Sequence, residues 1–361
     1  MRRARMVRIA ATLAVLAGSI FAISTPAPVG AAPEPLASPA RLVPVGPTRL
    51  ADTRQTECGC TAIDGSTIRV QVLGRSGIPA EATAAAITVT AVDAVRPTFV
   101  TAYPAGTARP GTSTVNVTSA SAVANSAIIP LGGGAVDLFA PSALSIVVDV
   151  TAVFVPDDLA FAGRFVPVAP TRLLDTREGA GPVGPNGAVT VPLTDDIDVD
   201  ALAVMVNVTS VDAPAPGFLT AHAAGSAGSV SSFLNPDGSG AAVAASVILP
   251  ASRDGITIVA SSGGNVVVDL VGWFTGPSGD PSADGLFVAA TPMRVLDTRT
   301  SSPRVWRGGA RELPSPVAGA SALVTNVTLD RADAAGFVTA YPAGTPLPGT
   351  SSDLTVRSSW R

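Results

Sequence analysis

Arg49-Leu50-Ala51-Asp52-Thr53-Arg54 occurs again, nearly unchanged, at residues 172–177 and 294–299. The central aspartates, Asp52, Asp175 and Asp297, are 123 and 122 residues apart. Such regular spacing is typical of a repeated domain rather than of a chance match. The sequence therefore predicts three copies of one module, here named copy 1 (residues 41–160), copy 2 (161–281) and copy 3 (282–361).

The sequence between successive motifs has the pattern of short β-strands. Apolar, β-branched runs recur in register, for example at residues 86–90, 204–209 and 323–328, and glycine or proline separates one run from the next. No stripe of helical period and length intervenes. About eight or nine short strands per module are typical of a two-sheet fold. We therefore predict an all-β protein of tandem antiparallel sandwich or jelly-roll-like repeats.

Copy 3 is shorter than the other two. It has no counterpart of residues 127–154, the segment that in copy 1 includes the predicted strand with Asp149, whose copy 2 equivalent carries Asp269. A sandwich without its last strands exposes unpaired edges and part of its core. We expect copy 3 to be truncated, to depend on a neighbouring copy for order, and to end in a tail that indicates a longer gene.

The N-terminus has the three parts of an export signal. A basic region with four arginines precedes an apolar stretch at residues 10–23, and small residues at 29–31 suit cleavage. The sequence predicts a signal peptide at 1–31, a linker at 32–40, and a mature chain with no membrane span. That chain is expected to be secreted or associated with the cell wall.

The charge of the mature chain argues against nucleic acid as a partner. The full chain has a formal charge of −4 and contains no lysine. Removal of residues 1–31 takes away four arginines, which leaves 19 arginines against 27 acidic residues, a charge of −8. Nucleic-acid partners are usually met by basic surfaces.

The repeated motif is the main candidate for a site. On a regular strand, Arg172 faces away from Asp175 and Arg177. Two arginines and an aspartate could bind a carboxylate or a sugar. Alternatively, they form an internal ion-pair network that joins the first strand to the last, since an aspartate buried among valines needs a counter-charge. The residues in question are Arg49, Asp52, Arg54, Arg172, Asp175, Arg177, Arg294, Asp297, Arg299, Asp149 and Asp269.

Two further groups are weaker candidates. Cys58 and Cys60 are the only cysteines, and in an oxidising compartment they are expected to form a local disulfide. The carboxylates Asp195, Asp196, Asp198 and Asp200 resemble a calcium-binding run but lack the glycine of known loops, so a solvated turn is the alternative. No catalytic motif, other metal site or cofactor site is predicted.

The chain resembles a module of exported actinobacterial proteins. The residues that carry the resemblance are Phe165-Val166-Pro167-Val168, the three Asp-Thr-Arg motifs, Asn207-Val208-Thr209, Ala124-Asn125-Ser126 and Asp269-Leu270-Val271-Gly272-Trp273-Phe274. The resemblance implies an accessory role in the envelope or outside the cell, with no established ligand.

Two functions are compatible with these observations. The first is a non-catalytic secreted or envelope repeat protein, structural or adhesive, with cell-wall polysaccharide or another envelope protein as partner. Tandem copies favour it because they raise avidity, whereas an aromatic content of 4% counts against a sugar-binding face. The second is an accessory region of a secreted cell-wall hydrolase or other hydrolase, of which this chain is a part.

Overall fold

The computed structural model describes residues 38–75, 77–118, 121–194, 197–290, 292–300, 304–348 and 354–356. The contacts divide the chain after Ala31, and all described residues belong to the unit Ala32–Arg361. The predicted signal peptide and the tail after Val356 lie outside the described residues. So does most of the predicted linker, whose last residue, Ala40, begins the first strand.

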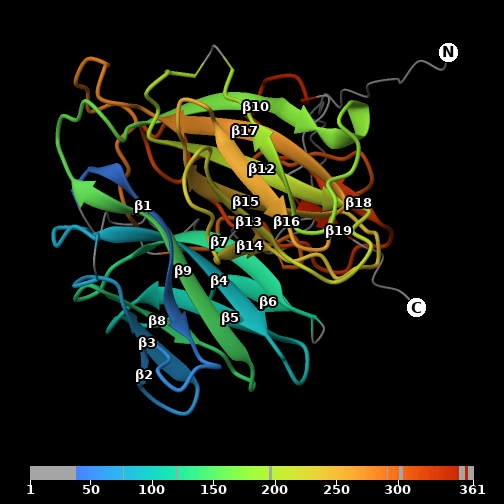
Figure 1. Cartoon of the computed structure of the whole chain (residues 1–361). Coiled ribbons are helices and arrows are strands. Elements are labelled where there is room, and N and C mark those ends of the chain that lie inside the picture. Colours follow the sequence, from blue (N-terminus) through green and yellow to red (C-terminus); the bar gives the residue numbers. More distant parts are fainter. Residues whose placement is uncertain are drawn as a thin grey trace, which may run out of the picture. The chain divides into compact units, whose positions relative to one another are not determined.

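Copy 1 consists of two antiparallel sheets (Figure 1). One has the order β1-β9-β4-β7 and the other β2-β3-β8-β5-β6. Valine, isoleucine and alanine side chains from both sheets form one buried cluster between them. The strands are β1 (Ala40–Asp52), β2 (Cys60–Ala62), β3 (Thr67–Gln71), β4 (Ala84–Val92), β5 (Thr98–Pro104), β6 (Val115–Val117), β7 (Val123–Pro130), β8 (Ala135–Phe139) and β9 (Ser145–Pro156).

Copy 2 repeats this topology without a counterpart of β2. Its sheets have the orders β10-β17-β12-β15 and β11-β16-β13-β14, and a second buried cluster fills the space between them. A short 3-10 turn, η1 (Thr176–Glu178), follows its first strand. The strands are β10 (Phe165–Asp175), β11 (Gly187–Val191), β12 (Ala203–Val211), β13 (Leu219–Ala223), β14 (Ser232–Leu234), β15 (Val243–Pro250), β16 (Ile256–Ala260) and β17 (Asn265–Phe274). The prediction of an all-β fold is confirmed.

The described part of copy 3 contains little regular structure. Its strands are β18 (Gly336–Val338) and β19 (Leu354–Val356), which pair with each other. It is nevertheless attached to the rest of the unit. Phe287 exchanges two backbone hydrogen bonds with Ala40, each 2.8 Å long, and its ring packs on Phe154 at 4.5 Å between centroids. The start of copy 3 thus packs against copy 1.

A third buried cluster includes residues of all three copies. Leu42 and Phe154 of copy 1, Ile248 and Phe274 of copy 2, and Ala289 of copy 3 belong to it. Burial of apolar side chains is favourable by about 25 cal/mol per Å². Burial of these apolar side chains therefore holds the copies together within this unit.

Candidate functional site

In copy 1 the motif forms a compact cluster of arginine and aspartate at the end of β1. Arg49 donates from Nε to Oδ1 of Asp149 at 2.5 Å and from Nη1 to Oδ2 of Asp52 at 3.2 Å. Arg54 donates two hydrogen bonds to the same Asp52, from Nε at 2.8 Å and from Nη2 at 2.7 Å. Because β1 pairs with β9, which carries Asp149, the cluster joins the first strand of the copy to the last.

Copy 2 has the same cluster. Arg172 donates to Asp269 at 2.5 Å and to Asp175 at 3.0 Å, and Arg177 donates to Asp175 at 2.5 Å. A regular strand would place Arg172 and Asp175 on opposite faces, and that expectation is wrong. The register between β10 and β17 shifts between Arg172 and Leu174, so an extra residue turns both side chains to one side.

In copy 3 the short-range half of the cluster is present. Arg294 donates to Asp297 at 2.7 Å, and Arg299 donates to the same carboxylate from Nη2 at 2.7 Å. The hydrogen bonds to Arg299 and Arg294 hold the pKa of Asp297 well below its usual range. Arg49 and Arg172 each also reach an aspartate of the last strand of their copy, whereas the ion pair of Arg294 is with Asp297.

Burial sets the electrostatics of this cluster. The Asp149 side chain is 1% exposed, and burial raises the pKa of its carboxyl although hydrogen bonding to Arg49 lowers it. Asp52 lies nearer the surface, and the hydrogen bond from Arg54 lowers its pKa. The two carboxyl groups therefore differ. The neighbouring arginines favour the ionised form of Asp52, whereas the ionised form of Asp149 is disfavoured by burial and is stabilised by Arg49.

The threonine of the motif closes the turn after the first strand. In copy 1 the Thr53 hydroxyl accepts a hydrogen bond from the Ile146 N–H at 2.8 Å. In copy 2 the fully buried Thr176 accepts from Val266 at 3.0 Å and donates to Asn265 at 3.1 Å. The hydroxyl thus satisfies a backbone donor at the start of the last strand.

Replacement of Thr176 by valine should therefore destabilise the protein. The variant keeps the shape of the side chain but leaves the Val266 N–H buried without an acceptor, at a cost of about 1–3 kcal/mol. Thr176→Ser keeps the hydroxyl, so its loss of stability should be smaller, about 1 kcal/mol for the missing methyl group. Thermal unfolding of the two variants is the measurement. Equal melting temperatures for Thr176→Val and the wild type would contradict this role.

A cleft of about 450 Å³ lies beside the copy 1 cluster. It is within the range of roughly 300–1,000 Å³ that small-molecule sites occupy. Its walls come from copy 1 and copy 2. The lining residues are Arg49, Arg54, Thr90, Val92, Ala122, Val147, Pro216, Gly217, Phe218, Val230, Ser232 and Asn235.

Two polar atoms in this cleft have unmet hydrogen-bonding capacity. Oγ1 of Thr90 and Oδ1 of Asn235 are buried, and neither has a hydrogen-bond partner among the described residues. Buried polar groups usually have a partner. Beside them lies Phe218, whose residue surface is 45% exposed. The cleft thus presents hydrogen-bonding groups and an aromatic ring.

The loop of copy 2 that precedes β14 closes one side of the cleft. Ser229 donates to the Pro47 carbonyl at 3.2 Å, and Arg49 donates from Nη2 to the Val230 carbonyl at 3.4 Å. The motif of copy 1 is thus in direct contact with copy 2. Arg49 and Arg54 could be identified as candidates from the repeated motif, whereas Thr90, Phe218 and Asn235 lie outside it. The signal available in the sequence was a phenylalanine at the same place in every copy, namely Phe99, Phe218 and Phe337. All three are exposed in the structure.

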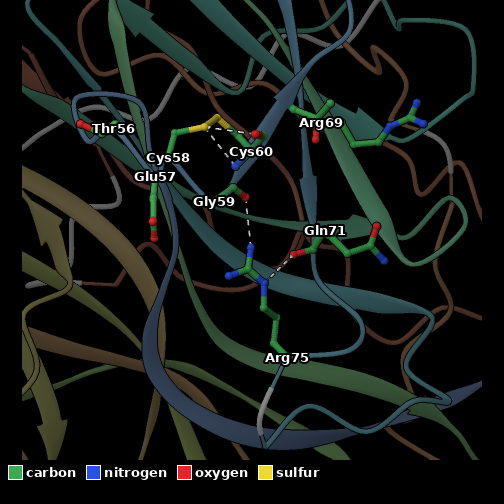
Figure 2. Close-up of a pocket in the computed structure, with 9 residues that line it drawn as sticks. Thr56, Glu57, Cys58, Gly59, Cys60, Arg69, Gln71 and Arg75 are labelled. Carbon is green, nitrogen blue, oxygen red and sulfur yellow. Dashed lines mark hydrogen bonds between the residues drawn. A yellow bond between two sulfur atoms is a disulfide. The ribbon is translucent and has the colours of Figure 1, made fainter.

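Cys58 and Cys60 form a disulfide at the edge of copy 1. A second pocket of about 380 Å³ lies around this bridge. Figure 2 shows the Arg75 guanidinium there, hydrogen-bonded to backbone atoms of Gly59 and Gln71. Arg75 also donates to the Leu50 carbonyl at 3.1 Å. Gly59 has φ +68°, and a Cβ there would lie 2.3 Å from that carbonyl. The bridge and Arg75 therefore shape a turn that packs closely on β1.

The carboxylate run is only partly described. Asp195 and Asp196 lie outside the described residues. Asp198 is exposed, and Asp200 accepts a hydrogen bond from the Ser278 N–H at 2.8 Å. Among the described residues, no group of three or more histidine, cysteine, aspartate or glutamate side chains is placed to hold a metal ion.

No family model matches the chain, and no curated protein matches it. Among solved structures it is similar to the tandem CBM22 domains of Paenibacillus barcinonensis Xyn10C, at 11% identity and a TM-score of 0.19, over 67% of this chain and 99% of that one. It is also similar to a chain of the Sulfolobus Turreted Icosahedral Virus, at 9% identity and a TM-score of 0.18, over 66% and 92% of the chains. TM-scores this low transfer neither a fold nor a function.

Within the described ranges, none of the helical segments has the length and apolar character needed to cross a bilayer.

Proposed function

We propose that this chain is a non-catalytic, exported carbohydrate-binding repeat protein of the cell surface, and that the cleft between copies 1 and 2 binds a neutral saccharide. The observation that carries the proposal is the pair of buried atoms without partners, Oγ1 of Thr90 and Oδ1 of Asn235, beside the exposed ring of Phe218. The predicted export signal and the resemblance to exported envelope modules support the location.

The charges around the cleft favour a neutral ligand over an anion. Arg49 is paired with Asp149 and Asp52, and Arg54 is paired with Asp52, so the positive charges are already balanced. Arg54 uses Nε and Nη2 on Asp52, but a guanidinium has five N–H donors, so further donors remain for a ligand. A bound carboxylate would have to compete with two protein carboxylates for these arginines.

The chemistry of the cleft suits sugar hydroxyl groups. A hydroxyl both donates and accepts, so it can donate to Oδ1 of Asn235 and either donate to or accept from Thr90. The apolar C–H face of a pyranose or furanose ring can pack on Phe218, as apolar groups pack on aromatic faces in binding sites. The low aromatic content of the chain is then less of an objection, because each copy places one exposed phenylalanine at the equivalent position.

Binding to cell-wall material tests the proposal. The full mature chain should be retained on actinobacterial walls and should bind at least one of the neutral hexasaccharides cellohexaose, chitohexaose and arabinohexaose. It should not bind trigalacturonate, an acidic comparator. Phe218→Ala should weaken binding at this cleft about tenfold, which corresponds to about 1.4 kcal/mol.

Phe161→Ala is the matched control, because Phe161 is 54% exposed but does not line the cleft. It should bind as the wild type does. Failure of the wild type to bind either the walls or any of the neutral hexasaccharides would overturn the proposal. Preference for trigalacturonate would overturn the assignment of a neutral ligand.

A further inference from the structure

The three copies share the residues of the cleft at a constant spacing of 119. Phe99, Phe218 and Phe337 are equivalent by this spacing, and so are Thr90, Thr209 and Thr328. Asn116 of copy 1 is likewise 119 residues before Asn235 of copy 2. The cleft beside Arg49 combines threonine from one copy with phenylalanine and asparagine from another. An equivalent cleft elsewhere in the chain requires two other copies that contact each other as copies 1 and 2 do at this cleft.

Copies 3 and 1 meet in that relation. Arg49 of copy 1 donates from Nη2 to the Val230 carbonyl of copy 2 at 3.4 Å. Arg294, the equivalent arginine of copy 3, donates from Nη2 to the Gly111 carbonyl of copy 1 at 3.1 Å. Gly111 and Val230 are also 119 residues apart. The same arginine thus contacts the same loop position in both pairs of copies.

Further side-chain hydrogen bonds join copies 3 and 1 near this loop. Asn326 donates to the Ser113 carbonyl at 2.8 Å, and Asn125 donates to Asn326 at 3.2 Å. Asn116 donates to the hydroxyl of Thr328 at 3.4 Å. Asn116 and Thr328 are the equivalents of Asn235 and Thr90, and between copies 3 and 1 this hydrogen bond joins them.

We propose that copies 3 and 1 form a second saccharide-binding cleft, equivalent to the first, from Arg294, Arg299 and Thr328 of copy 3 with Phe99 and Asn116 of copy 1. The chain is then bivalent. The residue surface of Phe99 is 36% exposed, and the side chain of Arg299 is 54% exposed and paired with Asp297, as Arg54 is with Asp52. This inference rests on the proposed function, since it assigns the same ligand class to the second cleft.

Bivalence has a measurable consequence for a polymeric ligand. Two sites on one chain that engage the same polysaccharide raise the apparent affinity by about a hundredfold or more over one site. A short oligosaccharide that fills one cleft shows no such gain. Binding to walls should therefore depend on both clefts, whereas hexasaccharide binding should report each cleft separately.

The experiment compares the full mature wild-type chain with Phe218→Ala, Phe99→Leu and the double variant. Calorimetry uses whichever of cellohexaose, chitohexaose and arabinohexaose binds most tightly. The wild type should show two sites. Each single variant should keep one site unchanged and bind about tenfold more weakly at the other, and the double variant should be weakened at both. In binding to cell walls, each single variant should lose most of the gain in apparent affinity that the two clefts of the wild type provide together. Leucine is used at residue 99 because Phe99 also packs near Phe139, at 6.2 Å between ring centroids.

The outcomes separate the two proposals. One site per wild-type chain, unaffected by Phe99→Leu and weakened about tenfold by Phe218→Ala, would overturn the second cleft and leave the first intact. No binding by the wild type would overturn the proposed function and the second cleft with it. Phe161→Ala again serves as the control, and melting temperatures establish that each variant is folded.

Discussion

Arg49→Ala should lower the stability of this protein by about 3–5 kcal/mol, because it leaves the Asp149 carboxylate buried without its counter-charge. Arg49 reaches Asp149 with Nε at 2.5 Å and with Nη2 at 3.4 Å. In a unit of this size, such a loss corresponds to a fall of about 8 °C or more in melting temperature. Thermal unfolding at neutral pH is the measurement.

Arg41→Ala is the matched control. Arg41 pairs with Asp157 at 3.1 Å, but both side chains are about one third exposed. Exposed pairs contribute about 0–1 kcal/mol, so this variant should melt close to the wild type. The double variant Arg49→Ala, Asp149→Asn should recover part of the loss, since a neutral amide is less costly to bury than a charge. Equal melting temperatures for Arg49→Ala and Arg41→Ala would show that the cluster does not stabilise the fold.

The effect of Arg49→Ala should also depend on pH. Burial already holds the pKa of Asp149 above its ordinary value of 3.8, and loss of Arg49 should raise it further. A carboxyl with a raised pKa in the folded state contributes stability that is fully present below the unfolded pKa and is lost as the pH rises through the folded pKa. The deficit of the variant should therefore be smallest near pH 4 and grow toward neutral pH. A deficit that grows as the pH falls would contradict this assignment.

Gly163→Ala should cost about 3 kcal/mol or more, because residue 163 has both a left-handed backbone and no room for a side chain. Its φ is +81°, and a Cβ would lie 2.2 Å from the Leu42 carbonyl oxygen. Gly163 accepts a hydrogen bond from Leu42 and donates one to the Thr275 carbonyl, each 2.8 Å long. Left-handed backbone costs about 1–2 kcal/mol for a residue with a Cβ, and the clash adds about 1–3 kcal/mol.

Gly74→Ala isolates the contribution of the clash. Gly74 has φ +80°, but a Cβ there meets nothing within 4 Å. The two variants share the backbone cost, so the difference between their free energies of unfolding measures the close approach of Gly163 to β1. Chemical denaturation of both variants provides these values. Equal losses would show that β1 moves away from residue 163 at little cost.

Some of the Arg/Asp cluster could be predicted because its members are close in sequence or follow a simple rule. Asp175 and Arg177 are two residues apart, so any compact turn brings them together. Asp149 and Asp269 stand within runs of valine, where a buried carboxylate needs a cation. The face of Arg172 was predicted wrongly, because the extra residue in β10 depends on the register with β17 and leaves no sign in the local pattern.

The cleft could not be predicted from local patterns. Arg49 and Val230 are separated by 181 residues, and Thr90 and Asn235 come from different copies. The repeated phenylalanine is visible in the sequence, but its exposure depends on which faces the two sheets bury. Phenylalanine is more often buried than exposed, so the exposure of Phe218 does not follow from the pattern.

The sequence by itself determined the all-β class, because short β-branched runs between glycine and proline favour strands wherever they occur. It also determined which residues repeat, since spacing is a property of the chain alone. Only the tertiary structure decided which repeated residues meet. That choice follows from apolar contacts among Leu42, Phe154, Phe274 and Ala289, which bring the copies together and place the arginines of one copy against the loop of another.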